Sequence, residues 1–590
     1  MSLYPKRWQI APPITPSHVA RFPDLHPVMV QVLYNRGVTD PHEARAFLNG
    51  DGGEGNPFDL AEMPTAVTRL RQALRAGEPM AVYGDFDADG VTATALLVQT
   101  LRALDGHVHP YIPHRVDEGY GLHTDALTML AQHGIRVVIT VDCGVRSLPE
   151  ITHANSLDID VIVTDHHSVG PELPAATAVI DPKRHDSQYF FHELSGVGVA
   201  FKLAQALLRS HRQTPVTKRE VRLEEKDLLD LVALGTVADL VPLVSENRTL
   251  VHRGLAQINR RERPGIEALC RQSGLKNGVI DARTIGYVLG PRLNAAGRVA
   301  HAKLAYQILE TKYPAEAERL AIELDQLNYE RRQLTQDIQQ RARHIALAED
   351  DDPPLLFAAA PDFPAGIVGL VASRLVDEFY RPAIVVEIGP EESRGSARSI
   401  PEFHITQALD ECADLLTRHG GHAAAAGFTV PNQHLDQLTS RLRAMAAQQL
   451  TDREPTPTLS IDAEVQLSQV SGGLYQELTR LEPCGYANPS PLLLSRNIQV
   501  QNQWAVGNAG KHLKVTLSDG TIIWDGIAFR QGDWAGKLPD RIDIVYHLEI
   551  NHWNNTSQLQ LNIQSIRPTG WDDAVTQEFN PGGSEPGGAP

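Results

Sequence analysis

The residues with the clearest chemical potential lie in YGDFDADG, where Asp85, Asp87 and Asp89 follow directly on an apolar run. Carboxylates this close raise one another's pKa and oppose compact packing unless a positive charge lies among them. The spacing therefore indicates a bound cation.

Further patches carry ligands of the same kind. Carboxylate oxygens and imidazole nitrogens suit Mg²⁺ and Mn²⁺, whereas zinc often recruits thiolates, and Cys143 is the only thiol close to these patches. Two such ions about 3.5–4 Å apart can activate a water molecule and stabilise the charge on a phosphate. The patches are VDCG with Asp142, TDHH with Asp165, His166 and His167, and GTVADLVPL with Asp239.

Each patch alone has a simpler explanation. A lone Asp-x-Asp is usually a solvated turn or a helix N-cap, and a pair of histidines alone carries little information. It is the combination of three acidic patches at successive strand ends, one with two adjacent histidines, that favours a metal site.

The elements that must position these patches alternate between residues 78 and 182. The apolar runs MAVY, RVVITV, DVIVT and TAVI are separated by helical segments such as GVTATALLVQTLRAL. This alternation is typical of βαβ units around a parallel sheet. The first three runs end in Asp85, Asp142 and Asp165, and the carboxyl ends of such strands form the ligand crevice of an open α/β sheet.

Patterns in the rest of the chain predict four further structured segments and one linker. Residues 1 to about 60 carry helical patterns, and Pro314 to about Ala348 carries one apolar stripe that predicts a helix roughly 50 Å long. A second α/β pattern covers about 354–448, and PTPT near 455 indicates a linker. Beyond it, alternating residues such as Leu513, Val515 and Leu517 predict a small antiparallel barrel or sandwich.

Composition limits the class of protein. With 590 residues, we expect three or four domains. The four cysteines are widely spaced, and we find neither a membrane-spanning run nor the apolar core of a signal peptide, so we expect a cytoplasmic protein with no membrane contact. A net charge of −18 argues against a simple basic surface for nucleic acid but leaves room for a local basic groove.

In order and spacing, the motifs resemble those of the DHH phosphoesterase superfamily, named for residues matching Asp165, His166 and His167. GPRLNAAGR, GSARSI, GGHAAAAGF and LEPCGYANPSPLL are similar to further signatures of its bacterial single-strand-specific 5′→3′ DNA exonucleases. The resemblance covers about residues 5–567. It implies an α/β fold with a helical segment at 1–60, a parallel-sheet DHH domain at 61–300, a long connecting helix at 301–350, a smaller α/β DHHA1 domain at 351–450, and a C-terminal β-barrel (OB-fold) at 455–570. The Gly/Pro-rich residues 571–590 are expected to be disordered.

The resemblance also implies roles for individual residues. Asp142 is the expected bridge between two divalent cations, Mn²⁺ or Mg²⁺, and His167 is expected to contact the scissile phosphate or support the site. Asp165 is expected to orient a histidine by accepting a hydrogen bond from it, without binding a metal ion itself. Catalytic roles fall on Asp87, Asp142, His166 and His167, and the metal ligands implied are Asp85, Asp87, Asp89, Asp142, His166 and Asp239.

A second set is expected to contact DNA phosphates. Arginines in loops are usually solvated, and the small residues of GGHAAAAG could instead pack helices closely. Trp504, Trp524, Phe529 and Trp553 could stack on bases or fill the barrel core. The phosphate-contacting residues implied are Arg115, Arg292, Asn294, Ser396, Arg398, Gly421 and His422.

The function implied is metal-dependent hydrolysis of single-stranded DNA from the 5′ end to mononucleotides, in recombination and repair. Partners implied are a RecQ-type helicase and a single-strand-binding protein. Three alternatives remain: a short-RNA or dinucleotide phosphodiesterase, a manganese pyrophosphatase, and a non-catalytic replication scaffold. The first two usually lack a unit like 455–567, and the scaffolds have lost metal ligands that this chain keeps. Some relatives carry an extra C-terminal domain, whose partner contacts cannot be transferred to this chain.

Overall fold

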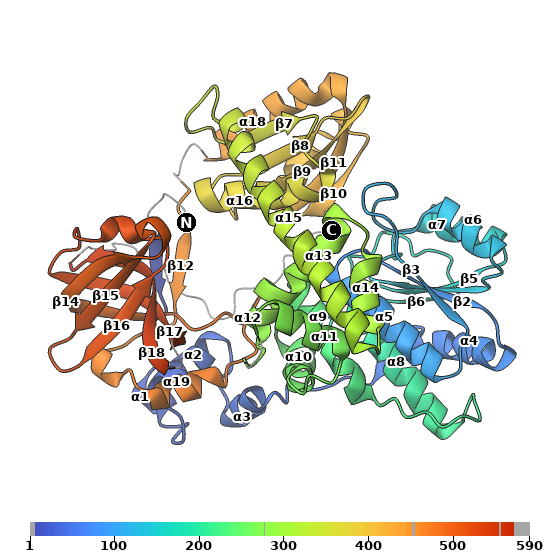
Figure 1. The fold of residues 1–590 in the computed structure, drawn as a ribbon, viewed down its shortest axis with the longest axis horizontal. Helices are drawn as coiled ribbons and strands as arrows, with labels where there is room; N and C mark the ends of the chain where they lie inside the picture. Colours follow the sequence, from blue (N-terminus) through green and yellow to red (C-terminus); the bar gives the residue numbers. More distant parts are fainter. Residues whose placement is uncertain (1–5, 276–277, 451–454, 554–555, 571–590) are drawn as a thin grey trace.

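The structure is a computed structural model that describes residues 6–275, 278–450, 455–553 and 556–570 (Figure 1). The expected disordered tail at 571–590 lies outside these residues. No helix among the described residues is long and apolar enough to cross a bilayer.

A five-stranded parallel sheet in the order β3-β2-β4-β5-β6 forms the first α/β unit, as predicted. The inner strands β2 and β4 are buried at every residue because helices cover both faces of the sheet. Figure 1 shows α6 and α7 on one face and α4, α5 and α8 on the other, where they belong to separate apolar cores. The bounds are β2 (Met80–Gly84), β3 (Val108–Tyr111), β4 (Val137–Val141), β5 (Asp160–Thr164), β6 (Ala178–Ile180), α4 (Met63–Ala76), α5 (Ala88–Ala103), α6 (Thr124–Gln132), α7 (Leu148–Ser156) and α8 (Gly196–Gln213).

A group of helices extends this unit and leads into the predicted long helix, α15 (Pro314–Ala346). The first half of α15 buries Leu320 and Leu324 in the core of the parallel-sheet unit, and its second half buries Ile338 and Ala342 in the next unit. One rigid helix therefore links two cores. The preceding elements are η2 (Glu225–Leu228), α9 (Leu229–Ala238), α10 (Ser245–Ile258), α11 (Pro264–Gln272), α12 (Ala282–Thr284), the π-helical turn η3 (Ile285–Leu289), α13 (Gly290–Val299) and α14 (Lys303–Glu310).

The second α/β unit has a mixed sheet in the order β10-β11-β9-β8-β7. The glycine-rich GGHAAAAG segment forms the β10–β11 hairpin, so its small residues do not pack helices together. Gly421 has a φ of 152°, and a Cβ there would lie 2.3 Å from the carbonyl oxygen of Ala425. The bounds are β7 (Leu356–Ala360), β8 (Ala383–Glu387), β9 (Glu392–Arg398), β10 (Arg418–His422), β11 (Ala425–Pro431), α16 (Ala365–Phe379), α17 (Ile405–Asp410), η4 (Ala413–Leu415), η5 (Asn432–His434) and α18 (Leu435–Leu450).

The C-terminal unit is a closed barrel of β14, β15, β16, β18 and β17, completed by pairing of β14 with β17. The alternating residues Leu513, Val515 and Leu517 are buried inside it, as predicted. The barrel is not purely antiparallel, because β16 and β18 pair in parallel. The bounds are β12 (Thr458–Ile461), β13 (Ala463–Glu464), β14 (Leu493–Val506), β15 (His512–Ser518), β16 (Ile523–Ala528), β17 (Arg541–Trp553), β18 (Thr556–Pro568), α19 (Gly472–Thr479), η6 (Leu467–Gln469), η7 (Asn508–Gly510) and η8 (Gly532–Trp534).

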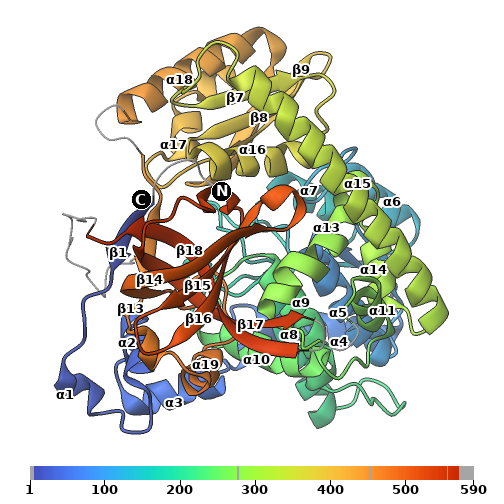
Figure 2. The ribbon, with the colours of Figure 1, turned by 60° about the vertical axis from the view of Figure 1, so that its left-hand side comes forward.

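The N-terminal helices α2 and α3 pack on the barrel unit (Figure 2), whereas η1, at the end of this segment, contacts α4 and α8 of the parallel-sheet unit. Met29 and Leu33 of α2 enter the barrel core. The strand β1 (Arg7–Ile10) pairs in parallel with β12, a short element that the helical pattern of this region did not predict. The other N-terminal elements are α1 (Pro16–Val19), α2 (Pro27–Asn35), α3 (Pro41–Asn49) and η1 (Pro57–Asp59).

Arg248 of α10 ties the parallel-sheet unit to the loop that leads into the barrel. Its side chain is 1% exposed and lies 4.1 Å above the ring of Phe47. The guanidinium donates hydrogen bonds of 2.8–3.3 Å to main-chain carbonyl oxygens, so one cation satisfies acceptors from both ends of the chain. The acceptors are the carbonyls of Phe47, Arg480, Leu481, Glu482 and Pro483.

We expect Arg248→Met to lower the free energy of unfolding by about 3 kcal/mol or more, because several buried carbonyl groups lose their donor at once. Arg253→Met is the matched control, since Arg253 lies on the same helix and makes a half-exposed ion pair with Glu54. Its loss should cost at most about 1 kcal/mol. Urea unfolding measures both, and equal losses would show that Arg248 is not an anchor.

Candidate metal centre

The acidic patches meet at the carboxyl edge of the parallel sheet. Asp85 follows β2, Asp142 follows β4, and Asp239 caps the end of α9. Within each of three groups, the ligand atoms lie within 4.8 Å of one another. The groups are Asp85, Asp87 and Asp142; Asp89, His166 and Asp239; and Asp142, His166 and His167.

Local backbone structure fixes two of the carboxylates. Asp87 is the N-cap of α5, where its Oδ1 accepts from the amides of Asp89 and Gly90. Asp89 is 1% exposed, and its two oxygens accept from the amides of Gly196 and Val197 at 2.7 and 2.8 Å. Those amides begin α8, whose positive dipole end favours an anion.

The site also needs two glycines in facing helices. A Cβ on Gly196 would lie 2.7 Å from Oδ1 of Asp142, and one on Gly235 would lie 2.8 Å from Oδ1 of Asp89. Any larger residue would push these carboxylates out of place. Asp142 itself has a φ of 62°, a left-handed conformation that Asp tolerates better than most residues.

Several buried ligand atoms have no hydrogen-bond partner among the described residues. These atoms are Oδ1 of Asp85, Oδ1 of Asp142 and both ring nitrogens of His166. Nε2 of His166 lies 3.0 Å from Oδ1 of Asp142 and 3.7 Å from Oδ2 of Asp239, but neither approach has hydrogen-bond geometry. Buried polar atoms are rarely left unpaired. Oxygen and nitrogen lone pairs that meet without bonding one another fit a shared divalent cation.

Burial and mutual repulsion oppose ionisation of these acids. Burial and the charge of Asp87 raise the pKa of Asp85 to about 8 and that of Asp239 to about 7. Burial and the neighbouring carboxylates raise the pKa values of Asp89 and Asp142 well above their usual range. Burial, with the charge of His167, lowers the pKa of His166 to about 3, so its ring is neutral as a metal ligand requires. A cation at this position would favour the ionised carboxylates.

His167 is held by Asp165. Oδ1 of Asp165 lies 2.8 Å from Nδ1 of His167 and also accepts from the amides of His166 and His167. Burial opposes both charges, but the hydrogen bond and the charge of the partner outweigh it. They lower the pKa of Asp165 to about 2 and raise that of His167 to about 9. The pair therefore presents a positive ring at neutral pH.

The expected phosphate pocket draws on two units. Arg115 follows β3 and lies 4.4 Å from the centre of the Phe86 ring. On β9, Arg398 donates to Oγ of Ser396 at 3.2 Å. Burial and the charge of Arg115 lower the pKa of Arg398, so the two cations, one from each α/β unit, lie within electrostatic reach of each other.

Arg292 and Asn294 are engaged inside the protein. Arg292 donates from Nε to Asp325 of α15 at 2.9 Å and from Nη1 to the carbonyl of Val288. Oδ1 of Asn294 accepts from the amide of Ala88 at 2.7 Å, beside Asp87. The structure thus gives both residues a part in holding α13 against its neighbours.

The remaining predicted residues belong to the β10–β11 hairpin. His422 has an exposed side chain, next to Gly421 at the end of β10. Burial and the charges of Lys183, His167 and Arg146 lower the pKa of His422. The charges of His167 and Lys183 thus act on His422, and its contact with phosphate stays a prediction.

Sequence reasoning did not single out Tyr120 or Lys183, which also lie at this centre. The hydroxyl of Tyr120 donates to the carbonyl of Asp142 and lies 3.2 Å from Nδ1 of His167. Lys183, which follows β6, forms an ion pair with Glu193 at 3.4 Å. Tyr120 lies between Gly119 and Gly121, a pattern typical of a turn.

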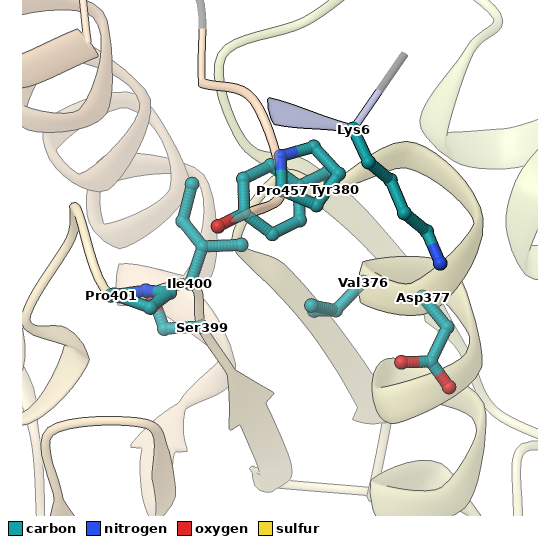
Figure 3. A pocket seen from close by; sticks show the side chains of 8 residues that line it. All are labelled: Lys6, Val376, Asp377, Tyr380, Ser399, Ile400, Pro401 and Pro457. Carbon is teal, nitrogen blue, oxygen red and sulfur yellow. The ribbon is translucent and has the colours of Figure 1, made fainter. Parts of the chain in front are cut away.

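A pocket of about 300 Å³ lies elsewhere, between α16, the residues after β9 and the N-terminal strand (Figure 3). Its lining includes Lys6, Asp377, Tyr380 and Pro457, and none of its residues belongs to the acidic groups. In the barrel, Trp504 and Phe529 are partly exposed, whereas Trp524 packs against the core. The side chain of Trp553 lies outside the described part of the structure.

Three family models match the chain: the DHH family N-terminal domain at residues 79–236, the DHHA1 domain at 352–448 and the RecJ OB domain at 461–565. The chain is 38% identical to the single-stranded-DNA-specific exonuclease RecJ of Bacillus subtilis, over 96% of this chain and 71% of that protein. It is 35% identical to the RecJ of Dickeya dadantii, over 94% and 98%.

Solved structures agree with these matches. The structure of Thermus thermophilus RecJ in complex with Mn²⁺ has a TM-score of 0.81 and 29% identity, over 95% of this chain and 79% of that one. The Mg²⁺ complex of the same protein has a TM-score of 0.73 and 28% identity, over 95% and 78%. With its metal-ligand geometry, its order of units and relatives that match nearly end to end, the chain belongs to the RecJ family of single-stranded-DNA-specific exonucleases.

Proposed function

We propose that this chain is a metal-dependent exonuclease that hydrolyses single-stranded DNA from the 5′ end to mononucleotides, in DNA recombination and repair. The observation that carries the proposal is the set of buried Asp and His atoms that meet without hydrogen bonds at the sheet edge. Membership of the RecJ family supplies the substrate.

The metal ligands proposed are Asp85, Asp87, Asp89, Asp142, His166 and Asp239. When bound, two ions of the Mn²⁺ or Mg²⁺ class supply Lewis-acid chemistry at a phosphate. Asp142 is the proposed bridge, because its carboxylate belongs to two of the three ligand groups. Asp87 serves two purposes, since one of its oxygens caps α5 while its carboxylate also belongs to a ligand group.

His167 is proposed to contact the scissile phosphate. The hydrogen bond to Asp165 fixes its ring and keeps it positive, which suits a group that must hold a phosphate anion. Tyr120 supports both His167 and the main chain of Asp142 from one side.

The terminal 5′-phosphate is proposed to bind Arg115, Ser396 and Arg398. A terminal phosphate carries more negative charge than an internal one, and guanidinium and hydroxyl donors match it. Because two α/β units contribute, the pocket forms at their junction, where ligand sites commonly lie. Gly421 and His422 are proposed to contact phosphate from the hairpin.

The alternative activities fit less well. A dinucleotide phosphodiesterase or a pyrophosphatase has no need of a closed barrel with partly exposed aromatic residues such as Trp504 and Phe529. A non-catalytic scaffold has no need of a complete ligand set. The proposal extends to a cytoplasmic location and to a RecQ-type helicase and a single-strand-binding protein as partners, all by family resemblance.

Asp142→Asn should lower nuclease activity by about a thousand-fold or more, because bound metal ions lower the activation free energy of such reactions by several kcal/mol. Mn²⁺ should raise the melting temperature of the wild type and not that of the variant. Asp125→Asn, which alters an exposed acid at the start of α6, is the control and should behave as wild type. Near-normal turnover by Asp142→Asn would reject this centre.

Without metal, stability should fall as pH rises from about 6.5 to 8. Asp85, Asp239 and His167 have raised pKa values of about 8, 7 and 9. The folded protein therefore holds protons that the unfolded chain has lost, and each such proton lowers stability by up to about 1.4 kcal/mol per pH unit. Thermal melts in chelator should show this slope, and saturating Mn²⁺ should flatten it. A slope that is zero or positive in chelator would contradict the assigned charges.

Arg398→Ala should weaken use of 5′-phosphorylated single strands by about 1.5–3 kcal/mol, the scale of a hydrogen bond to a charged group. The loss on 5′-hydroxyl strands should be clearly smaller. Arg441→Ala in the same unit is the control, because Arg441 makes only an exposed ion pair with Asp414 and hydrogen bonds at that surface. Comparing kcat/KM on both strand ends decides the point, since equal losses would mean that Arg398 does not bind the terminal phosphate.

A further inference from the structure

Four arginine side chains on α15, α16 and the barrel make no ion pair among the described residues. They are Arg331 and Arg332 of α15, Arg374 of α16, and Arg530, which follows β16; we call them the helix-arginine cluster. The other arginines of α15 do find acids: Arg319 pairs with Glu323, Arg341 with Asp362 and Arg343 with Glu378. Acidic residues exceed basic ones by 18 in this chain, so four unpaired arginines in one place are unusual.

The cluster members on the two helices are brought together by packing: Arg331 and Arg332 are neighbours on α15, and Arg374 of α16 reaches the same helix, where it donates to Gln339. Burial, with the charges of Arg374 and Arg332, lowers the pKa of Arg331. Burial, with the charges of Arg332 and Arg530, lowers the pKa of Arg374. Like charges held at short range cost free energy unless an anion lies among them. The barrel therefore contributes one charge to a group otherwise formed by the two helices.

The donors of the cluster are largely unused. Nε of Arg331 is buried and has no hydrogen-bond partner among the described residues. Arg374 donates to a neutral acceptor, Oε1 of Gln339, at 3.3 Å. Planar guanidinium groups with free donors match the oxygens of phosphate groups.

The helix α13 links the cluster to the metal centre, because it packs against α15 and α16 and Asn294 accepts from the amide of Ala88 beside Asp87. Arg298 of α13 donates to the carbonyl of Gly366 in α16 at 3.2 Å, and the charges of Arg331, Arg115, Arg398 and Asp87 all act on it. Nε of Arg298 is also buried without a partner. At the other end, Arg530 directly follows Phe529, a partly exposed ring that packs edge-on against His512 of the barrel. Figures 1 and 2 show α15 running beside both α13 and α16, so packed helices carry three of the four arginines.

We propose that Arg331, Arg332, Arg374 and Arg530 bind successive backbone phosphates of the single strand, on its way from the barrel to the metal centre. This rests on the proposed function. Contacts to phosphates carry no base information, so the grip is independent of sequence. The cluster engages only strands long enough to reach beyond the centre, which separates polymeric substrates from dinucleotides.

The test combines Arg332→Gln with Arg374→Gln, and uses Arg341→Gln with Arg343→Gln on the same helix as the matched control. Binding of a labelled, 5′-phosphorylated 20-nucleotide strand is measured by fluorescence anisotropy in chelator over a range of salt concentrations. We expect Kd to rise about 10- to 100-fold at low salt, and the salt slope to fall by about 0.7 for each lost contact. The control should stay within about two-fold of wild type.

Kinetics with Mn²⁺ give a second readout. The cluster variant should show a raised KM on the 20-nucleotide strand and unchanged kcat/KM on a 5′-phosphorylated dinucleotide, which does not reach the cluster. Because the substitutions relieve repulsion, the variant should melt no lower than wild type. Arg530→Asn tests the barrel side separately, since Asn tolerates the φ of 59° at this position.

Two outcomes would overturn the inference in distinguishable ways. If wild type binds the strand and the cluster variant binds it with the same Kd and salt slope, the cluster does not hold the strand, and the proposed function stands. If wild type neither binds nor cuts single strands, the proposed function itself fails, and this inference fails with it.

Discussion

The repulsion among carboxylates gathered at one edge of the parallel sheet is the constraint on which the rest of the structure depends. Asp85, Asp89 and Asp142 are almost fully buried, and their pKa values are raised because burial and like charge both oppose ionisation. A fold can hold such a group only where the backbone supplies compensation or a cation does. The amides that begin α8 compensate Asp89, and the unpaired atoms of Asp142 and His166 are left for a cation.

Positive charges are crowded in the same way at two places outside the metal centre. The charge of Arg115 acts on Arg398, and the helix-arginine cluster places like charges together around α15. Bound phosphate groups would reduce the repulsion in both groups of arginines, just as a metal ion would reduce the repulsion among the carboxylates. Two features hold these groups in fixed positions. The helix α15 packs into two cores, and Arg248 fixes the loop that leads into the barrel. Binding of metal ions and of DNA phosphates would therefore lower the electrostatic free energy that these unpaired charges raise.

Much of the fold and of the centre could be predicted from the sequence. The alternation of apolar runs and helical segments predicts the parallel sheet, and the acids that follow Gly84 and Val141 predict which side chains meet, because parallel strands end at one edge. The period-two pattern at Leu513, Val515 and Leu517 likewise predicts the barrel, as the structure confirms.

What the sequence could not predict depends on contacts between distant segments. The strand at Arg7–Ile10 exists because of its partner at Thr458–Ile461, some 450 residues later. Arg292 binds Asp325, a partner that only the packing of α13 on α15 brings within reach. Tyr120 and the members of the helix-arginine cluster have no local motif, since their proximity to the centre or to one another is set by the packing of whole units.

Counting bound Mn²⁺ by equilibrium dialysis at neutral pH tests the central claim most directly. If the buried acids and His166 are arranged around cations, the wild-type chain should retain two ions per molecule and release protons as they bind. Retention of no Mn²⁺ by the folded wild-type protein, together with nuclease activity that survives exhaustive chelation, would contradict it.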